Sequence, residues 1–273
     1  MSLSDTKRVT RKIGSKDEVD VFGDFDSASL LEQLEMLRGP RAIPSLIQRE
    51  SQSRHLGILS AVLESVHCPD QLFEKYYTSS SEWVRASISG NEKTPRWIID
   101  ELVKDPAITV RVKAAENPTC TIQDFETLCR TDDLDVLVAV ANADQASEEI
   151  LLKLSSSNQF EILSAVVANK NATESILERA LLFAQSAFSE VERRGLSRGI
   201  AAHTSCPDRI LETFLNSEDA QTRFSVAQNS NTSALNLEKL SSDLSAEVRW
   251  AVFENKNSSD AARATVNLIG FTS

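Results

Sequence analysis

The sequence predicts an all-α solenoid of about eight two-helix repeats, because one pattern returns every 26 residues and its apolar residues follow helical spacing. Each repeat can be numbered from the position of Asn91, which we call the zero position. Steps of 26 residues, with eight extra residues in one step, connect the zero positions of the series: Ser65, Asn91, Asn117, Ala143, Asn169, His203, Asn229 and Asn255. Self-similarity at a fixed period indicates a stack of equivalent units.

The residues before each zero position predict a first helix. In the repeat of Asn91, small or apolar residues lie three, four and seven positions earlier, at Ile88, Ser87 and Val84. Side chains with this spacing lie on one face of a helix. Most other repeats carry small or apolar residues at the same positions, so we expect each repeat to begin with a helix that buries this face.

A second apolar stripe follows seven to eleven residues after the zero position, as at Ile98, Ile99 and Leu102. It predicts a second short helix. One such pair cannot bury its apolar stripe alone, so the pairs must stack on one another. The turn between the two helices is marked by a proline in four repeats: Pro69, Pro95, Pro118 and Pro207.

The repeat array is expected over residues 58–268, and the segments around it have distinct roles. Residues 1–25 form a charged arm, first basic and then acidic, which fits either a flexible tail or a docking arm. Residues 26–57 predict capping helices, because the end of an array needs a cover. Residues 182–193 hold the insertion, where helical spacing predicts a longer helix that serves as an irregular joint or a projecting contact element. Residues 269–273 form a C-terminal tail.

Several of these repeats share a motif with a known family. The pattern is Val-Arg in the first helix, Asn-Pro at its end and Asp-Pro after the second helix. It is carried by Val84-Arg85, Asp105-Pro106, Val110-Arg111 with Asn117-Pro118, and Val248-Arg249 with Asn255.

This pattern resembles the leucine-rich repeat variant family, which is similar to HEAT repeats. The resemblance covers roughly residues 58–268 and implies a right-handed superhelix of alternating α- and 3₁₀-type helices, or of two α-helices per repeat. The period of 26 residues is longer than the usual unit of the family. Some members carry a cysteine cluster for an iron–sulfur centre before the repeats. No such cluster precedes the repeats in this sequence, so no cofactor is carried over.

Four arginines recur six residues before the zero position, and an acidic residue precedes each of three of them. Asp105 lies six residues before Arg111, and Asp243 lies six before Arg249. The planar guanidinium group can bridge two repeats. We therefore expect a structural ladder of ion pairs along the seam between repeats rather than a row of ligand-binding arginines. The four arginines are Arg85, Arg111, Arg223 and Arg249.

The asparagines at the zero position predict structural caps of the first helices. Asparagine tolerates the left-handed conformation that often ends a helix, and its side chain can bind neighbouring backbone groups. Ser65 and Ala143 replace asparagine in two repeats. A structural cap that recurs in many repeats tolerates such replacements, whereas an obligatory catalytic residue would not. The predicted caps are Asn91, Asn117, Asn229 and Asn255, and Asn169 fits the same pattern.

Aromatic residues gather in the N-terminal third of the chain and provide the first candidate for a partner site. Tyr and Trp are favoured anchors at interfaces, although packing under the N-terminal cap is the competing explanation. We predict that these residues bind a partner if the region is exposed. The candidates are Tyr76, Tyr77, Trp83 and Trp97.

The cysteines predict no metal site and no disulfide. Cys68, Cys120 and Cys206 share the position three after zero, and Cys129 lies outside the pattern. Cys68 and Cys120 lie two repeats apart, roughly 20 Å if each repeat rises about 10 Å, which is too far for one zinc site or one disulfide. We expect small buried residues at these positions.

Composition and motifs favour a binding protein over an enzyme. The sequence contains no phosphate-binding loop, dinucleotide fingerprint or nucleophile elbow. No N-terminal signal peptide and no run of 18 apolar residues is found, so we expect a cytoplasmic protein. The net charge of −11 repels a phosphate backbone.

We therefore expect a non-enzymatic scaffold or adaptor that grips a protein or peptide, possibly a basic one, on its concave face. The alternative is a HEAT-like nucleic-acid-binding or DNA-repair protein that resembles the alkylpurine glycosylases. A strongly positive concave face would favour that alternative.

Overall fold

The computed structural model describes residues 18–38, 42–187 and 189–270, and this part of the chain contains nineteen helices and no strand. The N-terminal helices are α2 (Glu18–Ser27), α3 (Leu30–Arg38) and α4 (Pro44–Glu50). The next eight are α5 (Leu56–Glu64), α6 (Asp70–Tyr76), α7 (Glu82–Ser89), α8 (Arg96–Leu102), α9 (Ile108–Ala115), α10 (Ile122–Leu128), α11 (Leu134–Asn142) and α12 (Glu148–Leu154). The last eight are α13 (Phe160–Ala168), α14 (Glu174–Ala187), α15 (Glu190–Ala202), α16 (Asp208–Thr213), α17 (Ala220–Gln228), α18 (Ala234–Leu240), α19 (Ala246–Glu254) and α20 (Asp260–Ile269).

The predicted two-helix repeats are confirmed. From α5 to α20, the helices alternate between a first helix that ends near the zero position and a second helix that follows the turn. Both helices of each pair are α-helical over the described residues, so the structure has two α-helices per repeat rather than the 3₁₀ alternative.

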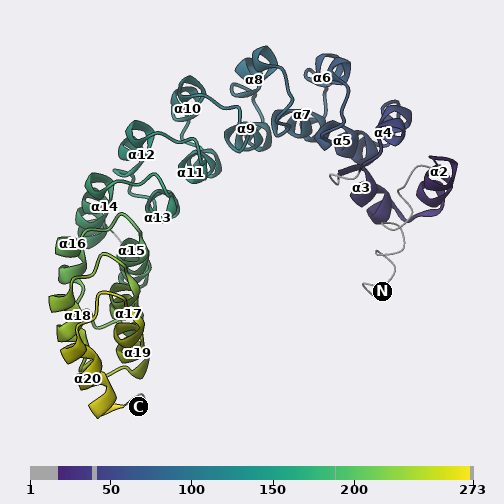
Figure 1. The fold of residues 1–273 in the computed structure, drawn as a ribbon. Helices are drawn as coiled ribbons and strands as arrows, with labels where there is room; N and C mark the ends of the chain where they lie inside the picture. Colours follow the sequence, from purple (N-terminus) through teal and green to yellow (C-terminus); the bar gives the residue numbers. More distant parts are fainter. Residues whose placement is uncertain (1–17, 39–41, 188, 271–273) are drawn as a thin grey trace. The chain divides into compact units, whose positions relative to one another are not determined.

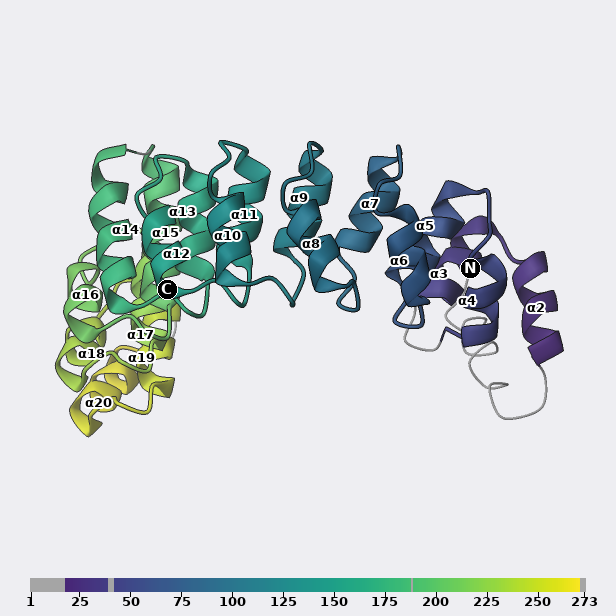
Figure 2. The ribbon, with the colours of Figure 1, turned by 90° about the horizontal axis from the view of Figure 1, so that it is seen from above.

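The chain forms two compact units, residues 1–120 and 121–273, a division that the sequence analysis does not make. We call them unit 1 and unit 2. Within each unit the first helices pack against one another, whereas the second helices contact one another much less. In unit 2, the first helices α11, α13, α15, α17 and α19 therefore form one tight row, and the second helices form a looser row beside it (Figure 1). Figure 2 shows α11, α13 and α15 side by side in that row.

The core of unit 1 is built from the two stripes that the repeat pattern predicts. Phe73, Val84, Ile88, Ile98 and Val110 are fully buried within one cluster. They come from four successive helices, α6 to α9. Each pair thus shares its apolar surface with the next one, as expected for a stack in which no pair can bury its stripe alone.

The N-terminal helices cover the first pair of this stack. Phe25 of α2, Leu37 of α3 and Ile47 of α4 form one buried cluster with Ile58 and Val62 of α5. The cap of α3 is Ser29, whose backbone N–H and hydroxyl both donate to Glu32 at 2.8 and 2.7 Å. Of the charged arm, residues 1–17 lie outside the described residues and the remainder belongs to α2.

The insertion, for which the apolar spacing predicts one longer helix, instead lengthens the two helices α14 and α15. Helix α14 has 14 residues and α15 has 13, compared with 7 and 9 in the preceding helices α12 and α13. Ser189 and Glu192 form a capping box that begins α15. A β-carbon on Gly199 would lie only 3.0 Å from a methyl carbon of Val167, so the close approach of α15 to α13 favours glycine at this position.

None of the described helices is both long enough and apolar enough to cross a membrane.

Candidate functional site

The zero-position asparagines bind the preceding helix pair through their side chains. Asn229 Nδ2 donates to the backbone oxygens of Ala201 at 2.8 Å and His203 at 3.0 Å, and its Oδ1 accepts from Asn231 N at 2.9 Å. Four other asparagines repeat this three-bond arrangement, with all side-chain distances between 2.7 and 3.1 Å. We call the set the asparagine ladder: Asn91 and Asn117 in unit 1, and Asn169, Asn229 and Asn255 in unit 2.

The expected left-handed cap conformation is wrong. Asn169, Asn229 and Asn255 have φ between −64° and −70° and ψ between 127° and 130°, which is extended backbone. Asparagine is needed for another reason. Its amide combines two N–H donors with one oxygen acceptor in a single short group, and this buried turn offers two free carbonyls and one free N–H.

His203 takes the asparagine position after the insertion and reproduces part of the same arrangement. The residue is buried, its Nε2 lies 3.0 Å from the oxygen of Asn169, and its Nδ1 accepts from Ser205 N at 3.1 Å. The tautomer with the hydrogen on Nε2 satisfies both contacts. A single ring N–H cannot also serve a second carbonyl, so the imidazole replaces two of the three asparagine bonds.

A second series of asparagines, two residues after the zero position, joins the pairs of unit 2. Asn231 Nδ2 donates to the oxygens of Thr204 at 2.7 Å and Cys206 at 3.0 Å. Asn171 and Asn257 make the equivalent bonds. The predicted residues do not include this series, although its signal is visible as Asn-x-Asn at residues 169–171, 229–231 and 255–257.

The position three after zero holds small, buried side chains. Cys68, Cys120 and Cys206 are buried there, as expected. Cys120 Sγ contacts the oxygen of Ala114, six residues earlier, at 2.9 Å. Thr94 makes the same contact through its hydroxyl. Burial raises the pKa of the Cys68 and Cys206 thiols to about 12. These thiols are therefore structural groups rather than nucleophiles.

Two of the four arginines, Arg85 and Arg223, pair with carboxylates in the turn before the next first helix. Arg85 binds both oxygens of Asp105 at 2.7 and 2.9 Å, and Arg223 binds both oxygens of Asp243 at the same two distances. These bidentate ion pairs connect two repeats, and all four side chains are at most 14% exposed. We call this set of contacts the arginine–aspartate seam.

The spacing of six residues reflects a bond from the arginine to a backbone oxygen, and not the expected ion pair with a carboxylate. Each of the four arginines donates through Nη1 to the backbone oxygen six residues earlier, at 2.5–2.7 Å: Arg85 to Ser79, Arg111 to Asp105, Arg223 to Ser217 and Arg249 to Asp243. The Asp105 and Asp243 carboxylates instead bind the arginine of the preceding repeat. Sequence spacing identified the right residues but not the atoms that meet.

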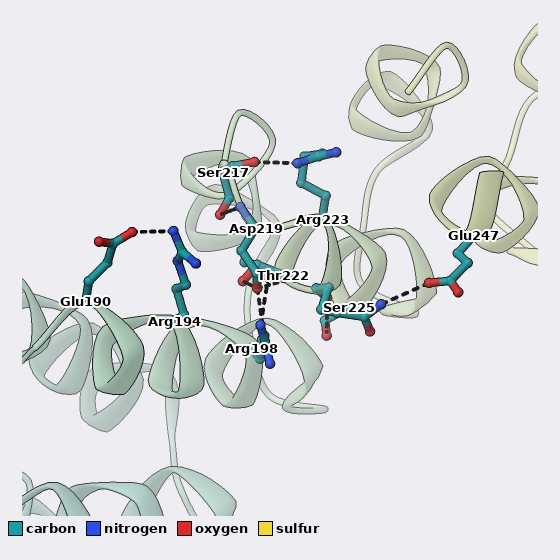
Figure 3. A network of polar contacts seen from close by, with 10 residues as sticks. Glu190, Arg194, Arg198, Ser217, Asp219, Thr222, Arg223, Ser225 and Glu247 are labelled. Carbon is teal, nitrogen blue, oxygen red and sulfur yellow. Dashed lines mark hydrogen bonds and ion pairs between the residues drawn. The ribbon is translucent and has the colours of Figure 1, made fainter. Parts of the chain in front are cut away.

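A network of polar contacts extends this seam across α15, α17 and α19 (Figure 3). Arg198 binds both oxygens of Asp219 at 2.7 and 2.8 Å, and Asp219 also caps α17 by accepting from Thr222 N at 2.9 Å. Gln221 donates to Glu247 at 2.9 Å. Arg194 pairs with Glu190 along α15.

The seam lowers the pKa of its aspartates. For Asp105 and Asp243, burial alone would raise the pKa, but hydrogen bonds from Arg85 or Arg223 and from a backbone N–H outweigh it, so the pKa falls below the ordinary value. For Asp219, the hydrogen bond from Arg198 is the largest cause of a strongly lowered pKa. These carboxylates stay ionised and hold the repeats together.

The four predicted aromatic residues lie on both first and second helices, and the exposure on which the prediction depends is present, since Trp97 is 46% exposed. Tyr77 and Trp97 meet edge to face, with ring centroids 5.1 Å apart, at the second helices α6 and α8. Tyr76 and Tyr77 also pack against the core. Trp83 lies on a first helix, α7, and is 65% exposed.

The exposed surface of the first helices is the most regular candidate for a binding site. Its residues lie eight and one positions before zero, and we call this surface the first-helix face. The two positions hold six carboxylates and no lysine or arginine. The six are Glu64 and Glu116 in unit 1, and Asp135, Glu161, Glu247 and Glu254 in unit 2, and all are exposed.

Two basic residues close to this face are already paired, and Lys256 is exposed in the turn after Glu254. Lys113 pairs with Glu116 at 2.6 Å, and Arg198 pairs with Asp219 at 2.7 Å. Over the described residues, no group of three or more His, Cys, Asp or Glu side chains could hold a metal ion. The face therefore presents carboxylates that can bind cations or hydrogen-bond donors.

No protein-family model and no curated protein matches this chain. Among solved structures, the chain is similar to one described as a leucine-rich repeat variant with a novel repetitive protein structural motif. The two share 19% sequence identity with a TM-score of 0.55, over 84% of this chain and 87% of the other. The chain therefore has the repeat fold of that leucine-rich repeat variant, as its sequence motif predicts.

Proposed function

We propose that this protein is a non-enzymatic scaffold that holds a segment of a partner protein on the first-helix face of unit 2. The observation that carries the proposal is the exposed carboxylates at two fixed positions of the repeat. No repeat has a lysine or arginine at either position. Repeat proteins bind partners along the extended surfaces that such rows create.

The use of the other polar residues supports a binding role. The asparagine ladder and the arginine–aspartate seam direct their side chains to backbone groups and to neighbouring repeats. They stabilise the stack. On the first-helix face, Glu64 pairs with Arg38, Glu116 pairs with Lys113 and Glu247 accepts from Gln221. Asp135, Glu161 and Glu254 are exposed and remain available for a partner.

The charge of the first-helix face favours a basic protein partner over a nucleic acid. Residues 121–273 contain 22 acidic and 13 basic side chains, whereas residues 1–120 contain 18 and 16. Most of the negative charge thus belongs to unit 2. Carboxylates repel a phosphate backbone and attract lysine and arginine side chains.

Photo-cross-linking tests which row of helices carries the partner. A benzophenone amino acid would be placed at Glu161 or Gln221 on the first helices, and at Glu149 or Leu235 on the second helices. All four positions are exposed. In cells of the source organism, we expect the first-helix positions to yield one common protein adduct and the second-helix positions to yield none.

Two results would contradict the proposal. One is a protein adduct that forms only from the second-helix positions. The other is a nucleic-acid adduct from the first-helix positions, which would favour the DNA-repair alternative.

A further inference from the structure

One surface depression of unit 2 lies on the first helices, between the last turns of α17 and α19. It is lined by Gln228, Trp250, Ala251, Glu254 and Asn255. Ala251 and Asn255 are buried, whereas the indole of Trp250 is half exposed and Glu254 is exposed. The depression therefore offers an aromatic wall beside a carboxylate.

The indole of Trp250 is supported from within the chain. The rings of Trp250 and Phe253 stack with an interplanar angle of 26° and a centroid distance of 6.2 Å. Phe224 occupies the equivalent position on α17. An exposed tryptophan that is held in this way has little conformational freedom to lose when a ligand stacks on it.

The charges around Trp250 are carboxylates. Glu247 and Glu254 lie three residues before and four residues after Trp250, on the same side of α19. The two arginines of these helices point elsewhere. Arg223 binds Asp243 and the oxygen of Ser217, as Figure 3 shows in part, and Arg249 is buried against the oxygens of Asp243, Leu244 and Gly270. Lys256, in the turn after α19, is the nearest exposed basic residue in the sequence.

We propose that this depression binds an arginine side chain from a segment of the partner protein, an inference that rests on the proposed function. The planar guanidinium group stacks on the Trp250 indole while its N–H groups donate to the Glu254 carboxylate. Arginine fits better than lysine, because a flat, weakly hydrated cation can stack on a ring and bind a carboxylate through two parallel hydrogen bonds.

The chemistry can be tested with short peptides and the full-length chain. The probe is a fluorescein-labelled Gly-Gly-Arg-Gly-Gly-Arg-Gly-Gly peptide, measured by fluorescence anisotropy. Matched peptides carry lysine or citrulline in place of arginine, and citrulline has the same shape without the charge. We expect the arginine peptide to bind at least tenfold more tightly than the citrulline peptide, and more tightly than the lysine peptide.

Substitutions locate the site. Trp250→Ala should weaken arginine-peptide binding about 3- to 30-fold, the range of a cation–π contact, and Glu254→Gln should weaken it about 2- to 5-fold. The controls are Leu235→Ala and Glu149→Gln, which remove an exposed apolar group and an exposed charge from the second helices of the same unit. Both controls should bind within twofold of the wild type. Circular dichroism would confirm that every variant is folded.

The inference is overturned if Trp250→Ala binds the arginine peptide like the wild type, or if the three peptides bind equally. Failure of peptide binding together with first-helix cross-links would remove the arginine site and leave the proposed function standing. Cross-links from the second helices alone would contradict both the arginine site and the proposed function.

Discussion

Asn229 shows why a single residue type recurs at the zero position. Its side chain satisfies two backbone oxygens of the preceding pair and one N–H of its own turn, in a place that water does not reach. Alanine at this position would leave two buried backbone oxygens and one partly buried N–H without partners, and each buried group left unpaired costs about 1–3 kcal/mol.

We predict that Asn229→Ala lowers the free energy of unfolding by about 3 kcal/mol, as measured by urea denaturation followed by circular dichroism. Asn231→Ala is a matched control, because Asn231 binds the neighbouring turn from an exposed position. It should cost about 1 kcal/mol. Equal losses for the two variants would show that burial does not set the strength of the asparagine ladder.

The converse substitution, His203→Asn, restores the common residue. We expect this variant to keep wild-type stability or to gain up to about 1 kcal/mol, because the amide can reach a second carbonyl that the imidazole leaves out. A large loss would mean that the insertion has changed this turn so that only the histidine fits.

At the scale of the helices, the arginine–aspartate seam connects consecutive pairs. Arg223 and Asp243 are both largely buried, so removal of one partner leaves a buried charge. The Arg111 guanidinium instead donates to the oxygens of Asp105 and Pro106. Both arginines donate to the backbone oxygen six residues earlier. Arg223 adds the bidentate pair with Asp243, whereas Arg111 adds a bond to the oxygen of Pro106.

We predict that Arg223→Ala destabilises the protein by about 3 kcal/mol, typical of a broken buried ion pair. Arg111→Ala should cost about 1–2 kcal/mol through lost backbone contacts. Lys239→Ala removes the exposed ion pair with Glu212 and serves as the control, with an expected loss below about 0.5 kcal/mol. Thermal and urea unfolding would both rank the variants, and the expectation fails if Lys239→Ala costs as much as Arg223→Ala.

At the scale of the whole molecule, the aspartates of the seam and of the network around Asp219 make the free energy of unfolding depend on pH. The pKa values of Asp105, Asp219 and Asp243 are lowered in the folded protein. Such groups stabilise the fold at any pH above the unfolded value of about 3.9, and this contribution is lost as the pH falls through the lower folded values.

We therefore predict a nearly constant contribution from these aspartates between pH 5 and 7 and a steep loss of stability below about pH 4. Urea unfolding at pH 7, 5 and 3 would measure it. In Asp243→Asn the acid-induced loss should be smaller, because one of the groups with a lowered pKa is absent. An identical pH profile for the variant would exclude Asp243 as a source of the effect.

Sequence reasoning reached the repeat architecture because each pair must repeat the same apolar stripes to pack on its neighbours. It also singled out the arginines and asparagines, whose spacing is regular. It did not reach the atoms that they contact. Arg85 pairs with Asp105, twenty residues later, and a spacing of six residues between Asp105 and Arg111 gave no sign of this.

The candidate binding surface was only partly visible in the sequence. Trp83 and Trp97 lie on different helices, in different rows, and both are exposed, so their role in partner binding stays a prediction. Trp250 is not among the aromatic residues that the sequence analysis selects. Trp83, Trp97 and Trp250 are all exposed, at 65%, 46% and 50%. Trp250 differs because it lines a surface depression with Gln228 and Glu254, and this depression depends on how α17 and α19 pack rather than on the local sequence.

The sequence by itself determined the period, the two helices of each repeat and the residues that bind between repeats, because these depend on periodic burial and on hydrogen-bonding groups at fixed positions. Only the tertiary structure decided which carbonyl each amide meets, which arginine each aspartate holds and which aromatic rings remain exposed. Those outcomes depend on how neighbouring pairs approach one another, and this approach is set by side-chain packing across repeats rather than by spacing along the chain.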